Sequence, residues 1–214
     1  KNKDRLVLVS SKKENIMQIQ NVLHAGKYKC AAVMICFYKE KDETYIVLEK
    51  RANGIHQGGE ISFPGGKRDF EDIDFKATAI RETSEELGIS KDKIEYLGYA
   101  GTFIGIFDLL LDVHLCKLKI EKKEELLYNK QEVEYLIFLP LSYLERTEPI
   151  MEIAELKNIP KFDVRAYGLP SRYWDTWPYY ERNLYFYFYQ GEVIWGITAE
   201  ILFSWMKGKK KEKL

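Results

Sequence analysis

The chain has 214 residues, of which 46% are hydrophobic and 14% aromatic, so it can bury a substantial core. Its 33 basic and 33 acidic side chains balance, which argues against a general nucleic-acid or membrane surface and leaves room only for local basic pockets. The 3 cysteines show no C-x-x-C spacing, and no apolar run approaches the roughly 20 residues of a membrane helix. We therefore expect one domain over residues 1–214, located in the cytoplasm, without a disulfide framework or a zinc site.

The predicted elements alternate between helices and strands along the chain. A capping-box pattern at Ser11 and Glu14 predicts a first helix over about residues 11–26. Apolar, partly β-branched runs predict strands over 31–38, 45–48, 96–104, 107–118 and 133–139, and a last helix over 197–206. The lysine-rich segment 208–214 is expected to be a disordered, solvated tail. This order is typical of an α/β or α+β domain.

The helix with the clearest limits is predicted over 75–87, between an N-cap at Asp74 and a C-terminal cap at Gly88. Its apolar positions fall on one side, and Glu82, Glu85 and Glu86 share another. Like charges at such spacings cost roughly 0.2–0.5 kcal/mol per pair, and Arg81 relieves only part of that cost. A hard cation such as Mg²⁺ or Mn²⁺ would compensate it. A solvated acidic face is the alternative interpretation.

A glycine-rich loop precedes this helix, with the sequence Ser62-Phe63-Pro64-Gly65-Gly66-Lys67. Glycines let a backbone approach another group closely and adopt a positive φ. The loop can therefore lie over the acidic helix and offer the Gly66 carbonyl to a metal.

Together these residues resemble the Nudix box. The matching positions are Gly66, Arg81, Glu82, Glu85, Glu86, Gly88 and Ile89. Asp72 stands where the general box has a glutamate, the spacer to Arg81 is one residue longer, and Thr83 replaces an apolar residue. The same variations are similar to the coenzyme A pyrophosphatase branch of the family, in which G-G-x-x-D-x-x-D precedes a T-A-x-R-E-T-x-E-E-L-G helix.

Two further segments are similar to the coenzyme A pyrophosphatase branch. Upstream of the box, Val47-Leu48-Glu49-Lys50-Arg51-Ala52 is followed by Gly59 to Gly66, and His56 is the nearest candidate for a second basic residue between them. Near the C-terminus, Ile194 to Ala199 looks like the W-G-x-T-A element of that branch. The resemblance spans roughly residues 31–206, and the stretch from about 147 to 181 carries no motif of it.

The resemblance implies a Nudix fold, with a mixed β-sheet between α-helices, and metal-dependent attack of water on a nucleoside diphosphate linked to another group. It implies Glu82 and Glu86 as metal ligands, with Glu85 as a third ligand or a helper of the attacking water, and the Gly66 carbonyl as a further ligand. Arg81 is expected either to orient Glu85 by a charge-assisted hydrogen bond or to act structurally. Glu132 and Glu134 are candidates for a general base from outside the box.

A small-molecule substrate needs cationic contacts, and the basic residues near the loop are candidates for them. They are Arg51, which is the first choice for a substrate phosphate, with Lys50, Lys67, Arg68 and His56. The expected substrate is coenzyme A, cut to 3',5'-ADP and 4'-phosphopantetheine, with Arg51 a candidate reader of the 3'-phosphate. Alternatives are ADP-ribose, an NDP-sugar or a dinucleoside polyphosphate, or a Nudix module that binds without turnover.

Two features outside the box have blander interpretations. The aromatic region from Tyr173 to Tyr189 could stack an adenine ring, although packing in a core or interface explains it as well. The three histidines are scattered and predict no nucleophile triad. We expect a monomer or a homodimer that binds neither nucleic acid nor membranes.

Overall fold

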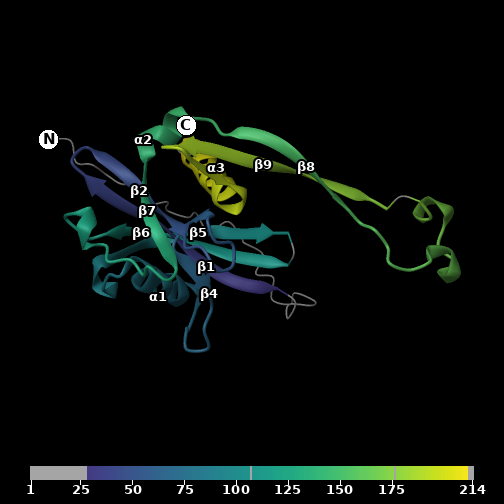
Figure 1. The fold of residues 1–214 in the computed structure, drawn as a ribbon, viewed down its shortest axis with the longest axis horizontal. Coiled ribbons are helices and arrows are strands. Elements are labelled where there is room, and N and C mark those ends of the chain that lie inside the picture. The colour runs from purple at the N-terminus through teal and green to yellow at the C-terminus, as the bar shows by residue number, and fades with distance from the viewer. Residues whose placement is uncertain (1–27, 107, 176, 212–214) are drawn as a thin grey trace. The chain divides into compact units, whose positions relative to one another are not determined.

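The computed structural model describes residues 28–106, 108–175 and 177–211. The helix predicted over about 11–26 lies outside these residues. The chain divides after Thr147 into two compact units, and Figure 1 labels their elements. The prediction of a single domain over residues 1–214 stays a prediction.

The first unit is built on a seven-stranded sheet. Its elements are β1 (Lys29–Glu40), β2 (Glu43–Arg51), β3 (Ile61–Ser62), β4 (Gly65–Lys67), α1 (Phe75–Leu87), η2 (Lys91–Lys93), β5 (Ile94–Gly105), β6 (Leu109–Leu118), η3 (Lys123–Glu125), β7 (Val133–Pro140) and α2 (Leu141–Arg146). The five strands predicted from apolar runs all lie in this sheet, with ends shifted by a few residues. The α+β class with a mixed sheet is confirmed.

Strand β1 is central to the sheet because it pairs along both of its edges. It runs parallel to β6 on one edge, and on the other it pairs antiparallel first with β4 and then with β2. Strand β2 also pairs with β3 and β7. From Met34 to Tyr38 every side chain of β1 is buried, so both faces of the strand are covered there. This explains why the sequence shows a continuous apolar run instead of alternation.

Helix α1 has the limits that the sequence predicts. The Asp74 side chain accepts a hydrogen bond from the N–H of Ala77 at 2.7 Å, and Gly88 ends the helix in the left-handed region with φ 63°. A side chain at Gly88 would overlap the backbone of Leu127, so the position requires glycine for space as well as for conformation. The helix packs on β1 and β4, which brings its acidic residues next to the glycine-rich loop.

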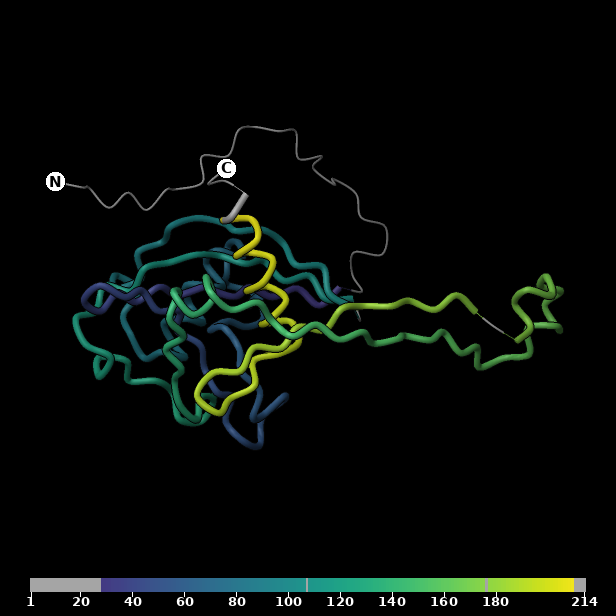
Figure 2. The backbone as a smooth tube through the Cα atoms, turned by 90° about the horizontal axis from the view of Figure 1, so that it is seen from above, coloured from purple at the N-terminus to yellow at the C-terminus, as the bar shows by residue number. Residues whose placement is uncertain are grey.

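The second unit is a three-stranded antiparallel sheet with one helix. Its elements are β8 (Ile150–Lys157), η4 (Val164–Tyr167), η5 (Ser171–Tyr173), β9 (Tyr179–Tyr189), β10 (Glu192–Trp195) and α3 (Gly196–Lys211), with the strand order β10-β9-β8. Strands β8 and β9 form a long ribbon with η4 and η5 at its far end (Figures 1 and 2). The aromatic run YFYFY lies in β9. Tyr187 is buried and Phe188 is 55% exposed, so packing in the core explains only part of this run.

The last helix is longer than the sequence predicts. Helix α3 continues through Gly208 to Lys211, so the prediction of a disordered tail is wrong for residues 208–211. Two lysines lie over aromatic rings four residues earlier in the helix: Lys207 over Phe203 at 4.4 Å and Lys209 over Trp205 at 4.9 Å. Such contacts at i,i+4 support a helix, and they offset the cost of about 1 kcal/mol for an internal glycine.

Candidate active site

The glycine-rich loop is fixed between β1 and α1. Gly65 has φ 152°, and a side chain there would overlap the backbone of Ala32 and Val33 on the paired strand. Its N–H donates a hydrogen bond of 2.7 Å to Oε2 of Glu86. The conformation of two adjacent glycines therefore brings the loop onto the acidic helix.

The three acidic side chains of α1 differ in their surroundings. Glu86 is only 5% exposed, the Glu82 side chain is 16% exposed, and the Glu85 side chain is 55% exposed. The expectation that the three share one face therefore needs correction for Glu86, which lies with the buried residues of the helix. The physical reason is that the Gly65 backbone covers Glu86 and satisfies one of its oxygens.

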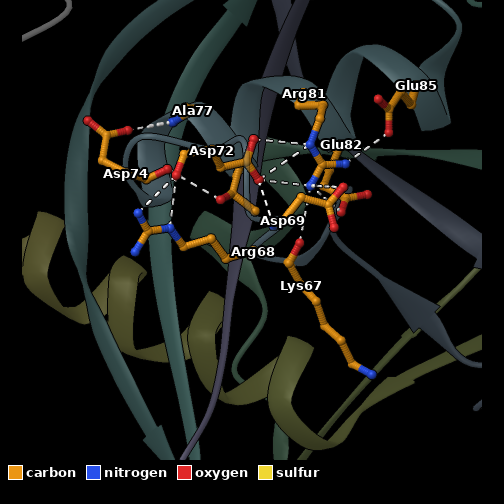
Figure 3. A network of polar contacts seen from close by, with 10 residues as sticks. Lys67, Arg68, Asp69, Asp72, Asp74, Ala77, Arg81, Glu82 and Glu85 are labelled. Carbon is orange, nitrogen blue, oxygen red and sulfur yellow. Dashed lines mark hydrogen bonds and ion pairs between the residues drawn. The ribbon is translucent and has the colours of Figure 1, made fainter.

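Arg81 links the loop, the turn before the helix and the acidic residues (Figure 3). Its guanidinium donates to both carboxylate oxygens of Asp72, to Glu82 at 3.0 Å and to Glu85 at 3.0 Å, and it also bonds the Lys67 carbonyl at 3.1 Å. Asp72, in the position where the general box has a glutamate, is thus the buried carboxylate that fixes this arginine. These hydrogen bonds with Arg81 hold the pKa of Asp72 well below its usual range.

Burial has the opposite effect on the acids under the loop. It raises the pKa of Glu86, and the nearby charge of Glu49 raises it further, while the hydrogen bond from Gly65 opposes both effects. Burial also raises the pKa of Glu82, against the effect of Arg81. Both glutamates are therefore held in a place where their charged forms need a compensating positive charge.

Glu49 is a site residue that the sequence analysis did not single out. It lies on β2 with its side chain fully buried, and burial raises the pKa of its carboxyl. The signal was present, because Glu49 directly follows the buried residues Ile46 to Leu48 in a strand where a lone acid is unexpected.

Strand β7 brings one of the two base candidates toward these acids. The pairing of β2 with β7 shifts its register between Lys50 and Arg51, and such irregularities re-aim side chains. The Glu132 carbonyl accepts a hydrogen bond from the N–H of Ala52 at 2.8 Å. The charge of Glu132 also contributes, after burial, to the raised pKa of Glu49 and of Glu82, so Glu132 is the better placed of the pair Glu132 and Glu134.

The basic residues predicted to bind substrate make different contacts in the structure. The Arg51 guanidinium lies 3.6 Å from Oε1 of Glu49, and its Nε donates to the His56 carbonyl. Arg68 donates to the carbonyls of Asp72 and Ile73, so it braces the turn before α1. The Lys67 side chain is exposed and points away from the carboxylates in Figure 3. Among the residues predicted to bind substrate, Arg51 is the one that forms an ion pair with a buried acid, Glu49.

The carboxylates of α1 and the Gly66 carbonyl are oxygen donors of the kind that binds a hard divalent cation. Within the described ranges, no group of three His, Cys, Asp or Glu side chains forms a ready metal cage. The Glu82 carboxylate is turned toward Arg81, and it fills the space that a side chain at Gly66 would occupy. Glu82 and Glu86 both lie against the Gly65-Gly66 segment, and carboxylate oxygens suit Mg²⁺ or Mn²⁺.

A family comparison agrees with this arrangement of loop and helix. The model of the NUDIX domain matches residues 28–162, which is more than half of the chain. The chain belongs to the Nudix family. It is accordingly a Nudix pyrophosphohydrolase acting on a diphosphate substrate, and enzymes of this family generally use divalent metals such as Mg²⁺ or Mn²⁺.

Individual relatives are similar at a moderate level. The chain is 27% identical over 183 residues to an uncharacterized Nudix hydrolase NudL of Photorhabdus laumondii, and the match covers 80% of each chain. It is 28% identical over 183 residues to Nudix hydrolase 15, mitochondrial, of Arabidopsis thaliana, covering 82% of this chain and 57% of the relative. A crystal structure of a MutT/nudix family protein from Enterococcus faecalis has the same fold, with a TM-score of 0.50 at 15% identity over 90% of this chain and 66% of that chain.

Two observations concern the location of the protein in the cell. No helix in the described part of the chain is long and apolar enough to cross a membrane. Among the relatives, one is named mitochondrial and another, also from Arabidopsis thaliana, chloroplastic. The cytoplasmic location stays a prediction.

The contact between Gly66 and Glu82 yields a first test. Replacing Gly66 by alanine should push the Glu82 carboxylate aside, because the new methyl group would occupy its place. The carboxylate is the flexible end of a side chain, so we expect a loss of stability within about 1 kcal/mol. We expect Mn²⁺ affinity, measured by calorimetry without substrate, to fall at least about tenfold.

The matched control is Gly208→Ala, where a side chain would meet open space. It should leave Mn²⁺ affinity unchanged. Parental affinity in Gly66→Ala would show that the position of Glu82 does not matter for the metal.

Proposed function

We propose that this chain hydrolyses the diphosphate of coenzyme A with Mg²⁺ or Mn²⁺, giving 3',5'-ADP and 4'-phosphopantetheine. Water adds across the P–O–P bond, so that each product keeps one of the two phosphates. The observation that supports this proposal most is the pair Glu82 and Glu86, held beneath the Gly65-Gly66 loop on one helix.

The cation is proposed to bind Glu82, Glu86 and the Gly66 carbonyl, with Glu85 as a further ligand. When bound, Mg²⁺ or Mn²⁺ supplies positive charge against the diphosphate and lowers the pKa of a water molecule. Glu86 is buried, and its Oε2 is engaged with the Gly65 N–H, so its position is fixed before the substrate arrives. Glu82, which Arg81 contacts at 3.0 Å, would supply the second carboxylate.

The proton of the attacking water needs an acceptor, and two glutamates are proposed for this role. Glu85 is exposed and is oriented by Arg81 through the 3.0 Å contact. Glu132 follows the loop before β7 and lies near enough to Glu82 to influence its ionisation. Both carboxylates have oxygens that can accept a proton, so kinetic measurements must choose between Glu85 and Glu132.

Arg51 is proposed to bind the diphosphate itself. It lies beside Glu49 and its side chain is 24% exposed, so it is near the acids and reachable by a ligand. The 3'-phosphate of coenzyme A is separated from the diphosphate by the width of the ribose, which makes Arg51 a poor reader of that group. Lys50 and Lys67, which are the lysines among the predicted substrate contacts, are proposed for the 3'-phosphate instead of Arg51.

The choice of coenzyme A rests on the three segments similar to the coenzyme A pyrophosphatase branch. They are Arg51-Ala52 with Gly59 to Gly66, the Asp72 form of the box, and Trp195 to Ala199. Asp72 is the buried partner of Arg81, at 3.0 Å from its guanidinium. ADP-ribose, NDP-sugars and dinucleoside polyphosphates are the competing substrates.

Removing a proposed ligand charge should abolish most of the activity. We expect Glu82→Gln and Glu86→Gln to fold and to lower kcat at least about 100-fold, because each loses a charged oxygen donor. Asp72→Asn should have a smaller effect, since it acts through Arg81. Glu95→Gln, which changes an exposed carboxylate on β5, is the control. Parental rates in both ligand variants would refute the assignment of the metal site.

Substrate choice is tested with coenzyme A, 3'-dephospho-coenzyme A, ADP-ribose, NADH and diadenosine polyphosphates, each with Mg²⁺ and with Mn²⁺. A charge-assisted contact is worth roughly 1.5–3 kcal/mol, so kcat/KM for coenzyme A should exceed that for the dephospho form by about 10-fold to 150-fold. Arg51→Ala should lower kcat/KM for both substrates by the same factor, because both contain the diphosphate.

Equal rates with the two forms, or a preference for ADP-ribose over both, would remove the coenzyme A assignment and leave the hydrolase assignment intact. An Arg51→Ala variant that loses only its preference for the 3'-phosphate would show that Arg51 reads that group instead.

A further inference from the structure

Glu49 has an oxygen that nothing in the described part of the chain satisfies. Its Oε1 accepts a hydrogen bond from the Ser62 hydroxyl at 2.9 Å. Its Oε2 is buried without a hydrogen-bond partner, and the side chain is 0% exposed. A buried carboxylate in this condition is costly unless a positive charge or a donor meets it.

The cation beside Glu49 does not meet that oxygen. Arg51 approaches Glu49 from the Oε1 side at 3.6 Å, which is longer than a hydrogen bond, and its Nε is already bonded to the His56 carbonyl. The ion pair with Arg51 therefore does not provide a hydrogen-bond partner for Oε2.

Glu49 and Glu86 reach the same region from different elements. Ser62 on β3 is paired with Glu49 on β2, and three residues later the Gly65 N–H binds Glu86 on α1. The carboxyl groups of Glu49 and Glu86 contact one another, and burial is the largest cause of the raised pKa of both. Two buried carboxylates side by side repel one another, and a divalent cation between them removes the repulsion.

We propose that Glu49 is an additional ligand of the divalent cation, which it binds through Oε2 together with Glu86. This inference rests on the proposed function, because it concerns the same metal. It adds a ligand from strand β2, outside the box, to the carboxylates of the helix. With Glu49 the cation would be held between the sheet and α1.

The test measures metal binding without substrate. Mn²⁺ binding to the full chain and to Glu49→Gln is followed by electron paramagnetic resonance of free Mn²⁺, and thermal unfolding is recorded in chelator. We expect Kd for Mn²⁺ to rise at least about tenfold in Glu49→Gln. The metal-free Tm should be unchanged or higher, because the amide still accepts from Ser62 while the repulsion with Glu86 is lost.

Two controls separate a ligand from a structural residue. Glu95→Gln, on β5 of the same unit, should keep the parental Kd. Glu49→Asp keeps the charge but withdraws it by one methylene group, and it should also weaken Mn²⁺ binding; this variant decides the question if Glu49→Gln does not fold.

The outcomes are distinct. If Glu49→Gln, or Glu49→Asp in its place, binds Mn²⁺ with the parental Kd, the inference is wrong and the proposed function survives through Glu82 and Glu86. A lower metal-free Tm with unchanged Kd would likewise show that Glu49 serves only the hydrogen bond with Ser62. If the parental chain binds no Mn²⁺ at all, the proposed function fails together with the inference.

Discussion

The hydrogen bond from the Gly65 N–H to Oε2 of Glu86 is the contact on which the site depends. It joins a loop that is paired with the central strand β1 to a helix that carries the box acids, and it does so while burying a carboxylate. Only glycine fits at Gly65, because a side chain would overlap the backbone of β1. The same close approach leaves Glu82 in contact with Gly66. Two small residues thus determine where the acidic side chains are held.

The remaining polar contacts supply positive charge to some of the acids beside Glu86. The buried Asp72 fixes the position of Arg81, whose other hydrogen bonds go to Glu82 and Glu85. Aspartate at this position is thus long enough to bind Arg81, although the general box has a glutamate there. The side-chain contacts of Arg81 go to Asp72, Glu82 and Glu85, whereas burial raises the pKa of Glu86 and of Glu49 without a hydrogen bond from Arg81 to oppose it. Arg81 therefore supplies positive charge to Glu82 and Glu85, whereas Glu49 and Glu86 need positive charge beyond that of Arg51.

Much of this could be predicted from the sequence, and the reasons for the failures are physical. Local patterns determined α1 closely, because Asp74 and Gly88 act through hydrogen bonds and backbone conformation within the helix itself. The burial of Glu86 and the role of Glu49 depend on contacts between α1, β2 and the loop, and no periodicity in a single segment reveals them. Helix α3 extends beyond Met206 because the ammonium groups of Lys207 and Lys209 lie over the rings of Phe203 and Trp205, which offsets the low helix propensity of Gly208. The ligand roles of Glu82, Glu86 and Gly66 stay predictions.

The most direct measurement is anomalous diffraction from crystals of the full chain grown with Mn²⁺. The account predicts an anomalous peak within bonding distance, about 2.0–2.3 Å, of carboxylate oxygens of both Glu82 and Glu86, under the Gly65-Gly66 loop. A peak located elsewhere, with Glu82 still turned to Arg81 and Glu86 bound only to the Gly65 N–H, would contradict it.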